Sequence, residues 1–157
     1  MALHLLAVGQ RMPAWVEAGC EDYQRRLPPH LKIRLQEIPL AQRGRNHDVK
    51  QARRQECERL AAALPRQAHR VLLDVRGQSW STEQLAEQLQ RWQALGQPIA
   101  LIIGGPDGYS EAFRAQAHQR WSLGPLTLPH PLVRVVLYEQ IYRAHTILTG
   151  HPYHRGG

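Results

Sequence analysis

The first group of residues that could support chemistry is a glycine-rich loop. The apolar, largely β-branched run Ile99–Ile103 is followed at 104–108 by Gly-Gly-Pro-Asp-Gly. A strand that ends in glycines lets a ligand approach the main chain closely, and open α/β sheets bind ligands beyond the carboxyl ends of their strands. The spacing matches neither the dinucleotide fingerprint nor the P-loop. The loop predicts a ligand-binding edge, with a plain tight turn as the alternative.

The second group is the C-terminal tail. After Gly150 it holds two imidazoles, a phenol and a guanidinium within five residues, in the order His151-Pro-Tyr153-His154-Arg155. Such groups can stack on a base, bind a phosphate or move a proton. The composition of the tail by itself favours disorder, because chain termini are ordered only where something ties them down.

Two further positions are candidates for ligand contacts. The loop at 43–47, Arg-Gly-Arg-Asn-His, is rich in donors suited to phosphate, and an ordinary solvated connection is an equally good interpretation. Asp74 lies near the end of a second apolar run, 71–75, where an open sheet would again present ligand groups.

The net charge favours a polyanionic partner. The chain carries +7 at neutral pH, and only two of its 20 basic residues are lysines. A genome rich in guanine and cytosine would explain the preference for arginine but not the net charge. Nucleic acid is therefore the leading class of partner.

Length and composition predict one domain spanning residues 1–157. No apolar run is long enough to cross a membrane, and the N-terminus lacks a signal pattern. Cys20 and Cys57 lack metal-ligand spacing, and the nine histidines form no ligand motif. We therefore expect free thiols, a reducing cytoplasm and no metal site.

Apolar strands alternate with amphipathic helices across short connections, which predicts an α/β fold with parallel strands. Ser81-Thr-Glu-Gln84 is a capping box that begins one of the helices. The run at 31–36 alternates apolar with polar residues, as is typical of a strand near a sheet edge. The expected strands are 3–8, 31–36, 71–75 and 99–103, and the expected helices are 13–27, 47–64, 82–95 and 131–149.

Two of these helices carry informative faces. The helix at 47–64 is expected to bury Val49, Ala52, Cys57, Leu60 and Leu64, and to expose a face of mixed charge that includes Glu56. The last helix has one apolar stripe for the core and a second stripe that contains Arg134, Tyr138 and Tyr142. We expect this second stripe to contact a partner subunit or the substrate.

Several short segments, in order along the whole chain, carry a resemblance to a known family. Together they resemble the small bacterial pseudouridine N3-methyltransferases of large-subunit ribosomal RNA, in the SPOUT superfamily. The segments are Ala7-Val-Gly9, Leu73-Asp74, Ile103-Gly-Gly-Pro106-x-Gly108, Leu126-Thr-Leu-Pro-His130, Arg134-Val-Val and Tyr153-His154.

The resemblance implies a SPOUT-type α/β domain with a mostly parallel sheet flanked by helices, a trefoil knot in its C-terminal half, and a homodimer. It also implies S-adenosylmethionine as the cofactor. By position the implied cofactor-binding residues are Leu73, Gly104, Leu123, Gly124, Pro125, Leu126, Thr127 and Leu128. Pro125 departs from the usual pattern, because proline has no N–H to offer the cofactor.

The implied activity is methyl transfer to N3 of a pseudouridine in 23S ribosomal RNA, on the assembled ribosome. The candidate catalytic residues are Glu139, Tyr153, His154 and Arg155, and the candidate RNA-binding residues are His130, Arg134 and Arg143. Glu139 could instead be an ion-pair partner of Arg143, one helical turn away. A basic ribosome-associated protein without enzymatic activity and a flavodoxin-like nucleotide-binding domain are the alternatives.

Overall fold

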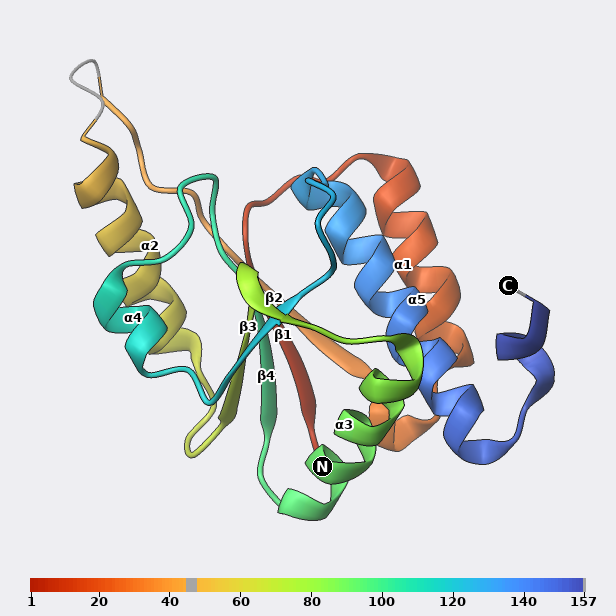
Figure 1. The fold of residues 1–157 in the computed structure, drawn as a ribbon. Coiled ribbons are helices and arrows are strands. Elements are labelled where there is room, and N and C mark those ends of the chain that lie inside the picture. The colour runs from red at the N-terminus through yellow and green to blue at the C-terminus, as the bar shows by residue number, and fades with distance from the viewer. Residues whose placement is uncertain (45–47, 157) are drawn as a thin grey trace.

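A computed structural model describes residues 1–44 and 48–156. At its centre lies a five-stranded sheet in the order β2-β1-β4-β3-β5, and all of its paired strands run parallel (Figure 1). The parallel α/β arrangement predicted from the sequence is confirmed. The strands are β1 (Leu3–Val8), β2 (Ile33–Ile38), β3 (His69–Ser79), β4 (Ile99–Ile103) and β5 (Gln119–Ser122).

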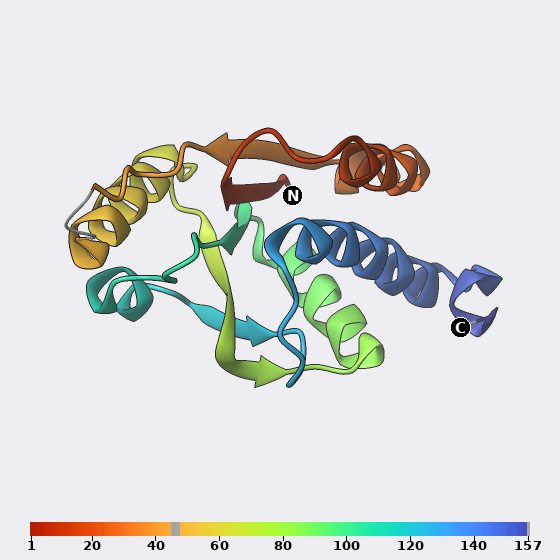
Figure 2. The same ribbon diagram turned by 90° about the horizontal axis from the view of Figure 1, so that it is seen from above.

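Helices cover both faces of the sheet. Viewed from above, α1, α3 and α5 lie on one side of the strands, and α2 and α4 lie on the other (Figure 2). The α-helices are α1 (Ala14–Arg26), α2 (Val49–Ala63), α3 (Thr82–Leu95), α4 (Glu111–Ala115) and α5 (His130–Thr149). Two short 3-10 helices, η1 (Pro29–Leu31) and η2 (Pro152–Gly156), complete the described elements.

The central strands explain the two hydrophobic cores. Successive side chains of a strand point to opposite faces, so Ile99, Leu101 and Ile103 pack under α3 and α5, whereas Ala100 and Ile102 pack under α2 and α4. Every residue of β4 is buried. This is why β4 reads as a continuous apolar run, as strands buried on both faces do.

Local signals in the sequence placed several elements correctly. The capping box between Ser81 and Gln84 begins α3. The alternating run at 31–36 overlaps β2, an edge strand that begins two residues later, because Leu31 belongs to η1. The trefoil knot that the family resemblance implies stays a prediction.

The strand prediction was incomplete at the other edge of the sheet. The polar segment after the glycine loop contains α4 and β5, neither of which was expected, and β3 continues past residue 75 to Ser79. A Cβ at Gly77 would lie 2.5 Å from the backbone carbon of Arg120. The glycine therefore lets β3 run close against β5 beyond residue 75, where the expected strand ended. The register between these strands shifts between Leu73 and Gln78.

In α2, the burial predicted for one apolar residue and for one charged residue is wrong. Val49 is exposed, whereas Glu56, assigned to the solvated face, is 1% exposed. Ala52, Cys57 and Leu60 are buried as expected, and Leu64 is partly buried.

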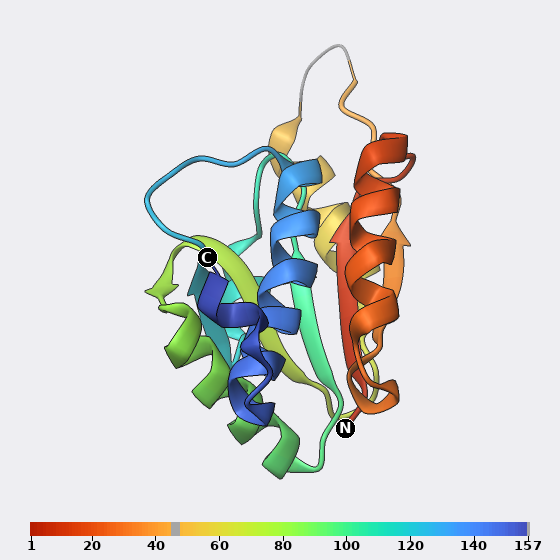
Figure 3. The same ribbon diagram turned by 90° about the vertical axis from the view of Figure 1, so that its right-hand side faces the viewer.

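The first three residues of the second stripe of α5 are also buried, so the expectation that they face a partner or substrate is wrong, whereas His145 is half-buried and Thr149 exposed. Arg134, Tyr138 and Tyr142 are 2%, 4% and 8% exposed. The cause is that α5 packs against the sheet with α1 on one flank and α3 on the other (Figure 3). A helix enclosed in this way buries residues on nearly every side.

The C-terminal tail is ordered rather than free. Residues Pro152–Gly156 form η2, which packs against the end of α5. The ring of Tyr153 stacks edge-on against Tyr142 at 4.7 Å between centroids. This aromatic contact holds the tail in place, which the composition of the tail did not predict.

Candidate active site

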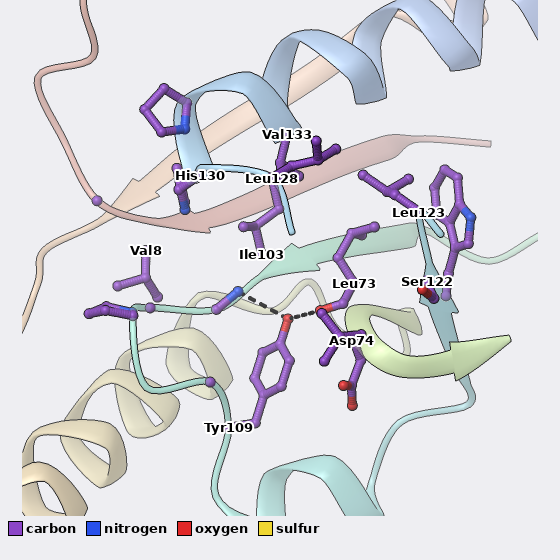
Figure 4. A pocket seen from close by; sticks show the side chains of 18 of the residues that line it. Val8, Leu73, Asp74, Ile103, Tyr109, Ser122, Leu123, Leu128, His130 and Val133 are labelled. Carbon is purple, nitrogen blue, oxygen red and sulfur yellow. Dashed lines mark hydrogen bonds between the residues drawn. The ribbon is translucent and has the colours of Figure 1, made fainter. Parts of the chain in front are cut away.

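A cavity of about 670 Å³ opens at the carboxyl ends of β1, β4 and β5 and beside the middle of β3. Its volume falls in the range of about 300–1,000 Å³ typical of small-molecule sites. Four parts of the chain that are distant in sequence meet here: the end of β1, the middle of β3, the glycine loop and the connection from β5 to α5 (Figure 4). The edge predicted from the glycine loop does carry a cavity.

Most of the residues implied to bind a cofactor line this cavity. They are Leu73, Gly104, Leu123, Gly124, Leu126 and Leu128. The remaining two residues of the implied set, Pro125 and Thr127, are exposed and are not part of its lining. The structure therefore brings together six of the eight, and the missing N–H of Pro125 does not deprive the cavity wall of a donor.

Tyr109 connects the main chain at two of these positions. Its hydroxyl accepts a hydrogen bond from the N–H of Gly104 at 3.0 Å, and lies 2.8 Å from the carbonyl oxygen of Leu73 and 2.9 Å from that of Ile102 (Figure 4). Burial raises the pKa of Tyr109 far above its usual value. The phenol therefore stays protonated and donates its single hydrogen to one of the two carbonyls.

The glycines of the loop are required by the protein's own side chains. A Cβ at Gly104 would lie 2.8 Å from Cε1 of Tyr109, and a Cβ at Gly105 would lie 2.4 Å from Oε1 of Glu56. Of the three loop glycines only Gly108 has a positive φ, +72°. The expectation that these glycines clear space for a ligand thus needs correcting at 104 and 105, where neighbouring side chains fill that space.

Asp74 lies in the cavity wall but is already paired. Its carboxylate accepts hydrogen bonds from Nε of Arg114 at 2.9 Å and from the N–H of Arg76 at 3.0 Å. Arg114 also lines the cavity. This ion pair fixes α4 against β3 and gives one wall of the cavity a polar patch.

His130, at the start of α5, points into the cavity (Figure 4). Its Nε2 accepts a hydrogen bond from Nε of Arg134 at 3.0 Å. Burial, followed by the positive charge of Arg134, lowers the pKa of His130 to about 4. The imidazole is therefore neutral at physiological pH, and its basic nitrogen is occupied.

Arg134 is used inside the protein. Its Nη1 pairs with Glu37 at 2.7 Å, and its Nη2 donates to the carbonyl oxygen of Gly9 at 2.8 Å. With its third contact on His130, the guanidinium joins the ends of β1 and β2 to the start of α5. This structure does not present Arg134 to RNA, in contrast to the expectation from the sequence.

Glu139 and Arg143 form the ion pair that was the structural alternative in the sequence analysis. Nη2 of Arg143 lies 2.8 Å from Oε2 of Glu139. The same carboxylate oxygen accepts a hydrogen bond from the hydroxyl of Tyr153 at 2.9 Å, and Oε1 accepts one from Gln140 at 2.7 Å. The guanidinium of Arg143 also lies 4.8 Å from the centre of the Tyr153 ring. These contacts hold the tail against α5.

The remaining tail residues are more open. His154 is half-buried, with Nδ1 3.4 Å from the hydroxyl of Thr146, and Arg155 is exposed. None of the four candidate catalytic residues lines the cavity. A helix rises about 1.5 Å per residue, so along α5 Glu139, which Tyr153 contacts, lies about 14 Å from His130 in the cavity wall, and Thr146, which His154 contacts, lies about 24 Å from it. Within one protomer, the structure does not bring these two groups together.

Other kinds of site find no support in residues 1–44 and 48–156. No group of three or more histidine, cysteine, aspartate or glutamate side chains there could hold a metal ion. None of the helices in these ranges is long and apolar enough to cross a membrane. Cys20 and Cys57 are free thiols, as expected.

Sequence reasoning missed several residues of the cavity wall. Tyr109 directly follows the glycine loop, but only the fold shows that its hydroxyl returns to Gly104. Gln10 and Met12, which follow β1, also line the cavity, as do Trp121 and Ser122 at the end of β5. The carboxyl-end rule could have identified the latter pair if β5 had been recognised as a strand.

Comparison with known proteins places the chain in a family. A family model described as "Predicted SPOUT methyltransferase" matches residues 1–154. The protein named ribosomal RNA large subunit methyltransferase H of Hahella chejuensis is 54% identical over 99% of both chains. The protein of the same name in Azotobacter vinelandii is 52% identical over 99% of this chain and 100% of its own length.

Solved structures give only a distant likeness. That of a Legionella pneumophila methyltransferase in complex with its cofactor SAM is 10% identical, covers 92% of this chain and 66% of its own, and has a TM-score of 0.48, too low to carry an argument. The full-length family match and the close relatives suffice: the chain belongs to the SPOUT methyltransferase family and groups within it with the ribosomal RNA large subunit methyltransferases H.

Proposed function

We propose that this protein transfers the methyl group of S-adenosylmethionine to N3 of a pseudouridine in 23S ribosomal RNA. The observation that carries the proposal is the cavity at the carboxyl ends of the parallel strands, whose wall contains six of the eight residues implied to bind the cofactor. The name shared by the 54% and 52% identical relatives supports large-subunit ribosomal RNA as the substrate.

The chemistry of the cavity fits this cofactor. Leu73, Leu123, Leu126 and Leu128 provide an apolar slot for an adenine ring. Loop main chain at 104–105 and 123–124 lies beside it, with the N–H of Gly104 bonded to the hydroxyl of Tyr109 and that of Gly124 to the hydroxyl of Ser122. The fit extends to volume, because the cavity has room for a molecule of drug size.

The sulfonium cofactor supplies an activated methyl group when it is bound. The task of the protein is then to align the nucleophilic nitrogen with that group, and positioning of this kind can supply much of the reduction in the barrier. In this chain Tyr109 and the Asp74–Arg114 pair hold the cavity walls, and the leucines give the slot an apolar lining.

The proton on N3 of the base must also be removed. His130 is poorly suited to accept it, because its pKa is about 4 and Nε2 already accepts a hydrogen bond from Arg134. Glu139 is occupied by Arg143 and Tyr153. Of the four catalytic candidates, His154 is the best suited to accept the proton, while the exposed Arg155 binds the RNA and Tyr153 holds the tail in place.

We infer a homodimer in which the tail of one copy completes the cavity of the other. The support is the separation along α5 between the cavity and the tail of the same protomer, about 14 Å from His130 to Glu139 and about 24 Å from His130 to Thr146. A two-fold arrangement would place the end of one α5 near the start of the other. Trp15, the second residue of α1, is 57% exposed and offers an apolar anchor for such an interface. The start of α1 lies beside the start of α5 (Figure 3).

The net charge of +7 suits a ribosomal RNA partner. We expect His130 and Arg143 to lie near bound RNA, and Arg134 to act through His130 rather than on the RNA itself. An enzyme that acts on assembled ribosomes would work in the cytoplasm.

The test is methyl transfer from labelled S-adenosylmethionine to ribosomes from cells lacking this methylation. Label is expected in 23S RNA, on N3 of a pseudouridine, and is expected to disappear when the ribosomes carry uridine there. Calorimetry with the cofactor alone provides the second arm. RNA binding without cofactor binding would favour the non-enzymatic alternative and contradict the proposal.

A further inference from the structure

A buried carboxylate that the proposed chemistry does not use lies directly behind the glycine loop. Glu56, from the middle of α2, is 1% exposed. Its Oε2 accepts hydrogen bonds from the N–H of Ala41 at 3.1 Å and from Nη1 of Arg43 at 2.8 Å, and its Oε1 lies 3.2 Å from Nη2 of Arg43. Burying a charge is costly unless it is paired in this way.

The guanidinium of Arg43 extends the network to the glycine loop. Nε donates to Oδ2 of Asp107 at 2.9 Å, and Nη1 also donates to the carbonyl oxygen of Ala41 at 2.8 Å. Hydrogen bonds to Glu56, and then to Asp107, raise the pKa of Arg43 further above its already high value. The Arg43 guanidinium therefore connects α2, the segment after β2 and the glycine loop by hydrogen bonds within the protein. It is not a surface donor for phosphate. Residues 45–47 of the arginine-rich loop lie outside the described residues.

The carboxylate also sets the position of the loop main chain by contact. A Cβ at Gly105 would lie 2.4 Å from Oε1 of Glu56, so the peptide chain rests against the carboxylate. The other side of the same residues, Gly104, Gly105 and Pro106, lines the cavity. Glu56, Arg43 and Asp107 do not line it.

We propose that Glu56 and Arg43 are positioning residues that hold the Gly104–Gly108 main chain in the conformation that receives the cofactor. They do so from behind the loop, through Asp107 and through contact with Gly105. The inference rests on the proposed function, because it takes the cavity to be the site of S-adenosylmethionine. It also explains why the side chains of Glu56, Arg43 and Asp107 are paired with one another behind the loop.

The experiment compares Glu56→Gln, Asp107→Asn and Arg43→Lys with the wild-type protein. Glu56→Gln preserves the volume of the side chain and removes its charge, whereas Asp107→Asn weakens only the contact with the loop. The dissociation constant for S-adenosylmethionine, measured by calorimetry well below each variant's melting temperature, is expected to rise at least tenfold for Glu56→Gln and several-fold for the other two. The KM for the cofactor is expected to rise in parallel, with the KM for ribosomes and the kcat at saturating cofactor within twofold of wild type.

Arg59→Met is the matched control. Arg59 also lies on α2 and also ties it to the segment after β2, through the carbonyl oxygen of Pro39 at 2.9 Å. A variant that loses this tie is expected to bind the cofactor as the wild type does. If Glu56→Gln does not fold, Asp107→Asn and Arg43→Lys decide the question.

Folded variants whose cofactor affinity stays within twofold of wild type would overturn the inference alone. An Arg59→Met affinity as weak as that of Glu56→Gln would do the same, because the effect would then be general to α2. A wild-type protein that does not bind S-adenosylmethionine would overturn the proposed function and this inference with it.

Discussion

The hydroxyl of Tyr109 lies 2.8 Å from the carbonyl oxygen of Leu73 while it accepts the N–H of Gly104 at 3.0 Å. One phenol thus connects the main chains of β3 and of the loop after β4 at two positions implied to bind the cofactor. The hydroxyl of Tyr109 thus holds β3 and β4 together in addition to the backbone pairing between them, in which Leu73 lies opposite Ile103.

Replacing Tyr109 by Phe removes that oxygen atom. The Gly104 N–H then loses its partner in a buried place, which costs about 1–3 kcal/mol of the free energy of unfolding. We also expect weaker binding of S-adenosylmethionine. Urea denaturation and calorimetry measure the two effects. Tyr138→Phe is the control, because Tyr138 is a buried tyrosine that does not line the cavity. Equal behaviour of both variants would contradict the role given to Tyr109.

Gly104→Val is expected to reduce cofactor affinity by more than tenfold. A Cβ at this position meets Cε1 of Tyr109 at 2.8 Å, so the ring must move and its hydrogen bonds must break. The oligomeric state should not change. The control is Gly44→Val, because no atom lies within 4 Å of a Cβ built on Gly44. Wild-type affinity in calorimetry of Gly104→Val would place the cofactor elsewhere.

Stopping the chain after Thr149 is expected to lower methyl transfer by orders of magnitude and to leave cofactor binding intact. The cavity loses none of its lining, whereas His154 and Arg155 are removed. The truncation also removes the packing of Tyr153 on Tyr142 and its hydrogen bond to Glu139. We therefore expect a loss of about 1–3 kcal/mol in stability as well.

Three measurements on the truncated protein separate the possible roles of the tail. Thermal melting, calorimetry with the cofactor and methyl transfer to ribosomes report stability, binding and catalysis in turn. Near-normal methyl transfer would show that the tail is only structural. Lost cofactor binding would show that the tail closes the cofactor site instead.

Trp15→Glu is expected to convert the dimer into monomers. Tyr138 and Tyr142 cannot serve for this test, because both are buried within the protomer and a charge there would unfold it. Trp15 is 57% exposed, so glutamate is tolerated in the free protomer and is unfavourable only in an interface. Sedimentation measures the mass, and Leu95→Glu, an exposed position on α3, is the control. A dimer of unchanged stability would exclude this face.

His130 predicts a pH dependence of stability. Its pKa in the folded protein is about 4, below the ordinary value of 6.5. Between these values the unfolded chain binds more protons than the folded one, so stability falls as the pH is lowered from 6.5 towards 4 and is complete above 6.5. His130→Gln keeps an acceptor for Arg134 and removes the titration. The free energy of unfolding, measured at pH 7 and pH 5, should fall less in this variant; equal slopes would contradict the assignment.

The sequence by itself determined the parallel α/β order, the capped start of α3 and the glycine loop of the cavity wall. These features depend on local signals: an apolar period, a Ser-to-Gln capping pair, and glycines after a buried strand. The family resemblance added Leu73 and the 123–128 segment, and five of these seven residues line the cavity.

Only the tertiary structure determined which charged and aromatic side chains are buried and which residues they pair with. Glu56 looks solvated on a helix of mixed charge, yet Arg43, 13 residues earlier, pairs with it in the interior. From the sequence, Arg134 was expected to contact RNA. In the structure its Nη1 instead pairs at 2.7 Å with Glu37, which lies 97 residues away in sequence. The period of a helix tells which residues share a face, but not how many neighbours enclose it. For α5, with α1 and α3 on its flanks, burial and hence chemical role were set by packing between distant segments.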